Sequence, residues 1–278
     1  MPQERLVVIG NGMAGARAVE EILARGGASR FLITMIGDEP YGNYNRILLS
    51  NVMNGSQDPT EIFLNSLPWY AENGIELLAG TRAERIDRFG KVVHCTSGTE
   101  VRYDRLIIAT GSRAMIPPIK NVYNGGNALR HNVFGFRTLD DCREIVTAAK
   151  AVKRAAVIGG GLLGLEAAKG LLTHGCEVHV VHLAPFLMNA QLDKTSAVMV
   201  RNAMQAMGIR VHTDKATTSI RLDDTGKVTG LEFKDGSTLD CDLIVVAAGI
   251  KPNSEIGLTA GLTVERAIVV DNHMRSVE

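Results

Sequence analysis

Two short glycine-rich segments constrain the fold of this chain more than any other feature. The first, residues 10–15, reads Gly-Asn-Gly-Met-Ala-Gly, and the second, residues 159–164, reads Gly-Gly-Gly-Leu-Leu-Gly. Each follows a short apolar run typical of a buried parallel strand and precedes a helical pattern of apolar residues. A glycine loop at a strand-to-helix turn is an arrangement that binds the pyrophosphate of a dinucleotide. The sequence therefore predicts two nucleotide-binding βαβ units.

The same order of signals occurs twice along the chain. Apolar strands that begin at Asp104 and at Asp242 both run into small residues, at 109–111 in the first case and 247–249 in the second. Two matched series of strand, glycine loop, helix and strand indicate an internal duplication. We therefore expect an α/β fold with two Rossmann-like domains, the second inserted into the first. Each should have a parallel sheet flanked by an antiparallel hairpin.

The expected domain boundaries follow from breaks in these patterns. Pro117-Pro118 neither continues a helix nor pairs within a sheet, so it marks a crossing between the domains. Inside the domains we expect a hairpin over 91–103 with a Ser97-Gly98 turn, and a helix over 139–152. The expected domains are 1–115 with 245–278 for the first, and 116–244 for the second.

Charge and cysteine content exclude several classes of protein. Thirty lysines and arginines balance thirty aspartates and glutamates, whereas a nucleic-acid-binding surface needs a basic excess. The four cysteines are far apart and the seven histidines lack metal-ligand spacing, so neither a disulfide framework nor a metal site is expected. No segment reads as a secretory signal or a membrane span. We expect a cytoplasmic protein that binds neither nucleic acid nor membrane.

Each glycine of the first segment has its own expected role. Gly10 allows the tight turn, Gly12 lets backbone N–H groups approach a pyrophosphate, and Gly15 lets the helix pack closely on the strand. Asp38 and Glu39 follow the second strand, where a carboxylate accepts hydrogen bonds from a ribose; an exposed turn would favour them as well. Their distance from Gly10 is longer than usual, so we expect an extended helix or connection.

Three further residues have both a functional and a structural interpretation. Arg46 follows the acidic pair and could neutralise a pyrophosphate or be a solvated loop residue. Glu166, on the first turn of the second helix, could contact a nicotinamide carboxamide or stabilise the helix dipole. His182 follows the second strand of the second repeat, at the position taken to correspond to the acidic pair, and could bond a ribose or merely end the strand. At the ribose, neutral His182 would accept NADH and NADPH, and protonation at about pH 6 would favour NADPH.

Several longer stretches carry a resemblance to a known family. They are the two glycine segments with their closing Ala-Thr-Gly and Ala-Ala-Gly sequences, together with residues 37–41, 44–50, 135–142 and 187–193. On these motifs the chain resembles the FAD-dependent pyridine nucleotide–disulfide oxidoreductase superfamily. It is most like the N-terminal flavin half of the large subunit of NAD(P)H-dependent nitrite reductases, near rubredoxin and ferredoxin reductases.

The resemblance implies that the first domain binds FAD and the second binds NAD(P)H. It places Glu166 near the nicotinamide, as the positioning residue for catalysis, and the backbone of Ala83 at the adenine. The residues implied for FAD are Gly10, Gly12, Met13, Ala14, Gly15, Asp38, Glu39, Arg46, Ala83, Thr110 and Gly111. Those implied for NAD(P)H are Gly159, Gly161, Leu162, Gly164, Glu166, His182 and Gly249.

The resemblance also implies hydride transfer from the nicotinamide to the flavin and then electron transfer to a separate metal centre, in assimilatory nitrite reduction. The acceptor would be an iron–sulfur and sirohaem domain, or else rubredoxin or ferredoxin; a homodimer is left open. The chain departs from the family pattern because it has no cysteine between residues 40 and 60 and has Asn51 where many ferredoxin reductases carry lysine. It ends before the family's flavin-binding Gly-Asp motif and interface domain, so we expect a truncated flavin domain. The rival hypothesis is a nucleotide-binding module without turnover.

Overall fold

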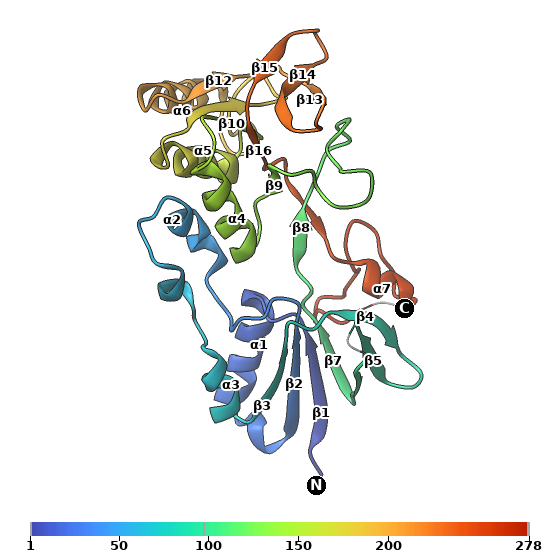
Figure 1. The fold of residues 1–278 in the computed structure, drawn as a ribbon. Coiled ribbons are helices and arrows are strands. Elements are labelled where there is room, and N and C mark those ends of the chain that lie inside the picture. Colours follow the sequence, from blue (N-terminus) through green and yellow to red (C-terminus); the bar gives the residue numbers. More distant parts are fainter. Residues whose placement is uncertain (1, 97, 277–278) are drawn as a thin grey trace. The chain divides into compact units, whose positions relative to one another are not determined.

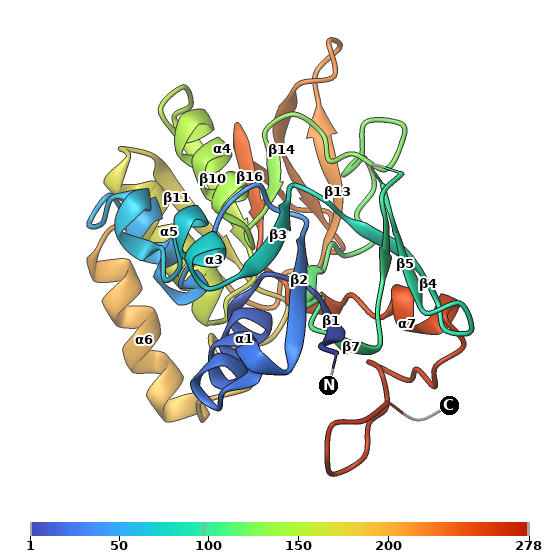
Figure 2. The ribbon, with the colours of Figure 1, turned by 90° about the horizontal axis from the view of Figure 1, so that it is seen from below.

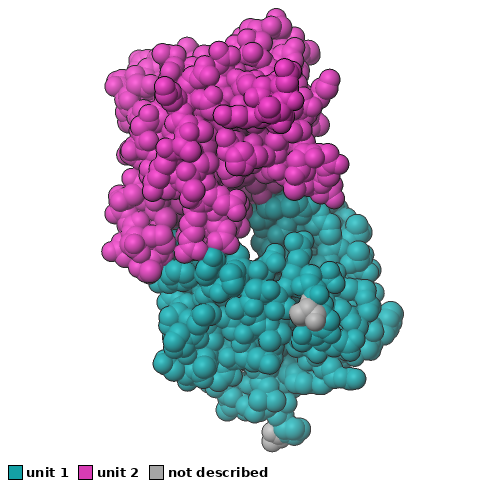
Figure 3. Space-filling view, viewed as in Figure 1, with its two compact units in different colours: residues 1–45, 62–113, 251–278 teal, residues 46–61, 114–250 magenta. Residues whose placement is uncertain are grey.

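The chain forms two units, each assembled from separate stretches of sequence. It crosses between them after residue 45, after residue 61, within β8 (Ser112–Ala114) and within β17 (Ile250–Pro252). Strands β8 and β17 are short and pair with each other. The computed structural model describes residues 2–96 and 98–276. Unit 1 comprises residues 1–45, 62–113 and 251–278, and unit 2 comprises residues 46–61 and 114–250 (Figure 3).

The crossing expected after residue 115 lies after residue 113, and the boundaries differ more widely in two other places. Unit 2 keeps the chain as far as residue 250, because β16 (Leu243–Val246) pairs in parallel with β10 (Arg154–Ile158) and with β9 (Val133–Gly135). A boundary at 245 would divide this buried strand. Unit 2 also includes residues 46–61, which the sequence pattern had assigned to the first domain.

A four-stranded parallel sheet in the order β3-β2-β1-β7 forms the centre of unit 1. Side chains of β1 alternate between its faces: Leu6 and Val8 pack against α1 and α3, while Val7 and Ile9 pack against an antiparallel sheet, β4-β5-β6, and α7. Figures 1 and 2 show α7 beside β4. The elements are β1 (Glu4–Ile9), α1 (Met13–Ala24), β2 (Phe31–Gly37), α3 (Leu67–Glu72), β3 (Ile75–Ala79), β4 (Ala83–Asp87), β5 (Val92–Cys95), β6 (Glu100–Arg102), β7 (Arg105–Ile108) and α7 (Glu255–Thr259).

Unit 2 repeats this plan with a five-stranded parallel sheet in the order β12-β11-β10-β16-β9. Ala156 and Ile158 of β10 face an antiparallel sheet, β13-β14-β15, through a shared apolar cluster that includes Leu231. Helix α5 packs against β10 and β11, and α4 packs against β9 and β16. The remaining elements are α2 (Leu49–Met53), α4 (Leu139–Ala149), α5 (Leu162–Thr173), β11 (Glu177–Val181), α6 (Lys194–Ala206), β12 (Arg210–His212), β13 (Thr217–Leu222), β14 (Val228–Phe233) and β15 (Thr238–Asp240).

Matched ion pairs mark the duplication at the level of single residues. Arg5 on β1 donates its backbone N–H (2.8 Å) and its guanidinium (2.8 and 3.0 Å) to Asp104, just before β7. Arg154 on β10 donates in the same way to Asp242, just before β16, at 3.1 and 3.3 Å. The Arg5 hydrogen bonds hold the pKa of the Asp104 carboxyl well below its usual range. In both units, therefore, the pair joins the starts of the first and last strands of one βαβ repeat.

The predicted fold class, α/β with two parallel-sheet units that each carry an antiparallel sheet, is confirmed. The helix expected over 139–152 ends at Ala149. The hairpin expected over 91–103 is present as β5 and β6, and Ser97 of its predicted turn lies outside the described residues. The long spacing before Asp38 comes from the connection after α1, which contains a 3₁₀ turn, Gly27–Ser29.

Candidate functional site

The first glycine loop turns β1 into α1 and leaves the start of that helix open. Gly12 is the N-cap of α1 and has no side chain to bond the first helical N–H groups, and the first turn carries no acidic residue. The uncapped N–H groups at a helix N-terminus, with the helix dipole, form a site for an anion. The loop therefore has the local chemistry expected of a phosphate-binding turn.

The three glycines of this loop meet different surroundings. Gly10 has φ +112°, and a Cβ placed on it would lie 2.1 Å from the carbonyl oxygen of Ala109. A Cβ on Gly15 would lie 2.0 Å from the carbonyl oxygen of Gly10. A Cβ on Gly12 would meet nothing within 4 Å. Gly10 thus makes the tight turn, Gly12 leaves room for a ligand, and Gly15 allows the helix to pack closely on the strand. This is the division of roles that the sequence pattern predicts.

The second loop repeats this division in unit 2. A Cβ on Gly159 (φ +130°) would lie 2.2 Å from the carbonyl oxygen of Ala247, and one on Gly164 would lie 1.9 Å from that of Gly159. Gly161 is open and is the uncapped N-cap of α5. Met13 and Leu162 follow the open glycines, and these two residues are 39% and 58% exposed. The open side of each loop is therefore free of protein side chains at the glycine where a ligand would approach.

In unit 1, the structure brings the acidic pair together with the loop before Ala83. The N–H of Thr81 donates to the carbonyl oxygen of Gly37 (2.8 Å), and that of Gly80 donates to Glu39 (3.2 Å). The exposed Asp38 carboxylate pairs with Arg82 at 3.6 Å, and Glu39 accepts a hydrogen bond from the Tyr44 hydroxyl at 2.6 Å. Asp38, Glu39 and Ala83 therefore lie along one edge of the parallel sheet, beyond β2 and β3.

Asn253 holds the Thr110-Gly111 turn, and the sequence pattern did not identify it. Its side-chain amide donates to the carbonyl oxygen of Thr110 (2.8 Å), and its own carbonyl accepts from the Thr110 hydroxyl (2.7 Å). Its N–H donates to Gly111 at 3.0 Å, and Arg113 donates to its Oδ1 at 2.9 Å. The partners are more than a hundred residues apart in the sequence, so no local pattern could have paired them.

A buried polar group beside the first loop was also missed. The Tyr70 hydroxyl donates to Oδ1 of Asn11 (2.7 Å) and accepts from the N–H of Asn43 (3.1 Å), and burial raises the pKa of Tyr70. Asn43 is 1% exposed, and its Oδ1 has no hydrogen-bond partner among the described residues. A buried amide oxygen without a partner costs free energy, and a donor on a bound molecule would remove that cost. Tyr70 itself is 1% exposed and belongs to the core of unit 1.

Arg46 belongs to unit 2, together with the rest of residues 46–61. It begins the segment 46–61, and its guanidinium donates to the carbonyl oxygen of Arg137 at 2.6 Å. The segment is attached to α5 by His174, whose Nε2 donates to the carbonyl oxygen of Met53 at 2.7 Å. The expected contact of Arg46 with a pyrophosphate stays a prediction.

Glu166 lies on α5 just after its first turn, which carries no acidic residue, and α2 of the same unit packs against this helix. Burial raises the pKa of the Glu166 carboxyl, and a hydrogen bond from the side chain of Ser50 lowers it by a smaller amount. No lysine occupies position 51, so the polar partner that α2 offers to this carboxyl is a neutral hydroxyl.

His182 follows β11, and both of its ring nitrogens are engaged within unit 2. Its Nδ1 accepts the backbone N–H of Gly160 at 3.0 Å, and its Nε2 lies 3.0 Å from Oδ1 of Asn189. The register shows that it does not correspond to the acidic pair of the first repeat. Ile9 pairs with Ile36 and Ile158 pairs with Val181, so His182 corresponds to Gly37, and the pair corresponds to Leu183 and Ala184. The expected correspondence of His182 with the acidic pair is therefore wrong, and a contact of His182 with a ribose stays a prediction.

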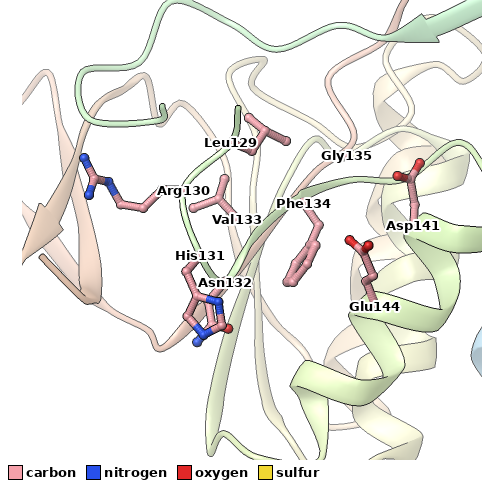
Figure 4. A pocket seen from close by; sticks show the side chains of 9 residues that line it. All are labelled: Leu129, Arg130, His131, Asn132, Val133, Phe134, Gly135, Asp141 and Glu144. Atoms are coloured by element: carbon pink, nitrogen blue, oxygen red, sulfur yellow. The ribbon is translucent and has the colours of Figure 1, made fainter. Parts of the chain in front are cut away.

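A separate pocket of about 370 Å³ lies beside β9 and contains none of the predicted site residues (Figure 4). Arg130 on its rim is already bonded to the carbonyl oxygens of Asn121 and Tyr123, and Asp141 caps α4.

No group of three or more potential metal ligands occurs in the described part of the chain. None of the described helices is long and apolar enough to span a membrane.

Comparison with known proteins gives consistent matches over nearly the whole chain. The family model described as pyridine nucleotide-disulphide oxidoreductase matches residues 4–278. A nitrite reductase (NAD(P)H) of Bacillus subtilis (strain 168) is 45% identical over 276 residues, which is 99% of this chain and 33% of that protein. The assimilatory nitrate reductase electron transfer subunit of the same organism is 42% identical, over 100% of this chain and 35% of that protein.

Among solved structures, the ferredoxin reductase for the CYP199A2 system from Rhodopseudomonas palustris matches with a TM-score of 0.89 and 31% identity. The match covers 99% of this chain and 66% of that one. The chain thus spans about a third of the length of the two curated relatives.

Proposed function

The chain belongs to the pyridine nucleotide-disulphide oxidoreductase family, and we propose that it passes electrons from NAD(P)H through FAD to a separate metal centre. The family match confirms the superfamily predicted from the sequence. The predicted class of enzyme, an oxidoreductase that uses NAD(P)H and FAD, is confirmed by the same match. The proposal is carried by one feature of both loops. Gly12 and Gly161 have free space beside their Cα atoms, whereas the flanking glycines of each loop lie against backbone carbonyl oxygens.

Unit 1 fits FAD by the chemistry of the groups around its glycine loop. The uncapped N-terminus of α1 would receive the pyrophosphate, and Met13 and Ala14 lie on this first turn. Asp38 and Glu39 would accept from the adenosine ribose, and the backbone of Ala83 would meet the adenine. The unpartnered Oδ1 of Asn43 supports a ligand with a hydrogen-bond donor beside the loop. The proposed set is Gly10, Gly12, Met13, Ala14, Gly15, Asp38, Glu39, Ala83, Thr110 and Gly111, with Arg46 as an additional phosphate contact.

Unit 2 fits NAD(P)H by the same argument. The N-terminus of α5 is uncapped at Gly161, and the carbonyl of Ala247 lies against the tight turn at Gly159. Gly249, at φ +119°, lies between β16 and β17, just after the Ala247 that borders the loop. Glu166 would accept the carboxamide N–H of the nicotinamide. The proposed set is Gly159, Gly161, Leu162, Gly164, Glu166 and Gly249.

The protein's own side chains supply position and charge more than covalent chemistry. When bound, the nicotinamide supplies a hydride that the flavin accepts and can release as single electrons. The four cysteines are all buried. Burial raises the pKa of Cys142 to about 11 and that of Cys241 to about 12, so neither forms a reactive thiolate at neutral pH. A thiol relay is therefore not the proposed exit for the electrons.

For the acceptor, we propose an iron–sulfur and sirohaem domain that acts in assimilatory nitrite reduction. The names of two relatives, a nitrite reductase and an assimilatory nitrate reductase electron transfer subunit, support this choice. Rubredoxin or ferredoxin is the second candidate, supported by the structural likeness to a ferredoxin reductase.

The test is an absorbance spectrum of the purified chain after incubation with FAD and removal of the excess. We expect flavin bands that bleach when NADH is added without oxygen. Gly12→Ala should prevent flavin retention, and Gly161→Ala should retain the flavin but abolish its bleaching. A folded chain that stays colourless after reconstitution would contradict the proposal and favour a module without turnover. Transfer from the bleached chain to ferredoxin, rubredoxin or an isolated sirohaem protein would then discriminate among the acceptors.

A further inference from the structure

In each glycine loop, the residue after the first glycine packs against the residue that follows or ends the second strand. In one unit the loop residue carries the side chain of this contact, and in the other unit the strand-end residue carries it. In unit 1 the loop itself supplies the side chain: Cβ of Asn11 lies 3.0 Å from the position a Cβ would take on Gly37. In unit 2 the loop residue is Gly160, and the side chain comes from His182 at the end of β11. A Cβ on Gly160 would lie 2.7 Å from Cγ of His182. The pair Asn11 and Gly37 is thus exchanged for Gly160 and His182.

The hydrogen bonds around Gly160 indicate which ring nitrogen of His182 acts as the acceptor. A backbone N–H can only donate, so the bond from Gly160 requires an unprotonated Nδ1. The proton of the neutral ring is then on Nε2, from which it donates to the amide oxygen of Asn189. On its other side, the carbonyl oxygen of Gly160 accepts from the N–H of Met188 at 2.8 Å. The backbone N–H and the carbonyl oxygen of Gly160 therefore both have partners. The shape of the loop depends on a neutral imidazole, because only an unprotonated Nδ1 can accept the Gly160 N–H.

We propose that His182 is a positioning residue that holds the second glycine loop in the shape that receives a dinucleotide pyrophosphate, and that it does so only as neutral imidazole. The inference rests on the proposed binding of NAD(P)H by unit 2. Protonation of Nδ1 replaces an acceptor with a second donor facing the Gly160 N–H, so the bond is lost and the loop is released. Because this acts on the pyrophosphate that NADH and NADPH share, the affinity for both falls together.

Other charged groups on the neighbouring elements have their own partners. Lys215, whose N–H donates to the carbonyl oxygen of His182, holds its ammonium against Asp235 and Ser237. Asp193 caps α6 through Ser196. His179 and His212 on β11 and β12 bond to each other, with Nδ1 of His179 2.9 Å from Nε2 of His212, and Glu177 and Arg210 pair next to them. Any effect of this histidine pair must be separated from that of His182.

The main experiment measures dissociation constants for NADH and for NADPH at about pH 7.5 and about pH 5.5, on the flavin-loaded chain. We expect both affinities to fall by about fivefold at the lower pH, the size of one lost hydrogen bond. The ratio of the two affinities should stay constant. A shift of the ratio toward NADPH at low pH would overturn the inference, because it would place His182 at the 2′-phosphate.

Three variants separate His182 from the rest of the molecule. His182→Asn places an amide oxygen near the position of Nδ1, so it should keep the affinity at pH 7.5 and remove most of the pH dependence. His182→Leu should weaken both coenzymes at both pH values. Asn189→Asp should favour the imidazolium and move the loss of affinity to higher pH. The His182→Asn variant retains the pair of His179 and His212, so any dependence that remains in it belongs to that pair. Unchanged pH dependence in His182→Asn would overturn the inference.

A second measurement does not depend on coenzyme binding. In the ¹⁵N-labelled chain, nuclear magnetic resonance should show His182 as the Nε2–H tautomer and the Gly160 amide as hydrogen-bonded, and both signals should change together as the pH falls. A chain that binds neither coenzyme would contradict the proposed function, yet this spectrum would still test the inference. A protonated Nδ1 at neutral pH, or a Gly160 amide that does not respond when His182 titrates, would overturn it.

Discussion

Single glycines carry separable roles in each loop, which makes the roles testable one at a time. Gly15→Ala should lower the free energy of unfolding by about 3 kcal/mol, because the new methyl would meet the carbonyl oxygen of Gly10 at 2.0 Å. Gly12→Ala should cost less than about 1 kcal/mol, since the position is open. Urea unfolding of the flavin-free chain measures both. Equal costs for the two variants would refute this division of roles.

Ser50 and Glu166 provide a second prediction at the scale of one side chain. The Ser50 hydroxyl stabilises the charged form of Glu166 against the effect of burial, so Ser50→Ala should raise the pKa of the Glu166 carboxyl further. A pH titration of the ¹³C-labelled Glu166 carboxyl measures the shift. Ser56→Ala is the control, because Ser56 is in the same segment and bonds Asn51 instead. A lower or unchanged pKa in Ser50→Ala would show that the hydrogen bond does not act on this carboxyl.

Strands β11 and β12 carry a histidine pair, buried His179 and half-buried His212, that should make unit 2 sensitive to acid. Burial lowers the pKa of both His179 and His212. Below about pH 6.5 the unfolded chain therefore takes up protons that the folded chain does not. The free energy of unfolding should fall as the pH is lowered through this range and level off below the folded pKa values.

Urea unfolding between about pH 7 and about pH 5 tests this expectation. His212→Gln removes one titrating ring, so its loss of stability over the range should be smaller than in the unmodified chain. His131→Gln, an exposed position of the same unit, should behave like the unmodified chain. If His212→Gln and the unmodified chain lose the same stability, the pair does not control the acid response.

At the scale of the whole molecule, a stretch from the first half of the sequence is part of the second unit. Met53 is fully buried and lies against Gly170, where a Cβ would be 2.8 Å from its Cγ. Met53→Ala should leave a cavity and cost ~2–5 kcal/mol. In native-state hydrogen exchange, we expect the backbone amides of α4 and α5 in unit 2 to lose protection, while those of β1 and β2 in unit 1 keep theirs. Met199→Ala, at a 72% exposed position, is the control. Loss of protection in β1 and β2 would contradict the assignment of residues 46–61.

Local patterns were sufficient to predict both parallel-sheet repeats and the glycine loops. A buried strand, a glycine that must adopt positive φ and an apolar helical face are each visible within about ten residues, because their causes are steric and hydrophobic constraints on neighbouring positions. Gly10 and Gly159, with φ +112° and +130°, are examples. For the same reason, the chain's likeness to an oxidoreductase family could be seen before its structure was known.

Other features depended on contacts between distant residues and could be decided only by the tertiary structure. Whether His182 or Leu183 corresponds to the acidic pair depends on the register of β10 against β11, and a shift of one residue moves a side chain to the opposite face. The bonds of Asn253 to Thr110, and the attachment of residues 46–61 to α5, join positions more than a hundred residues apart. Such pairings depend on which surfaces the folded chain buries together, and the sequence near either partner does not encode that choice.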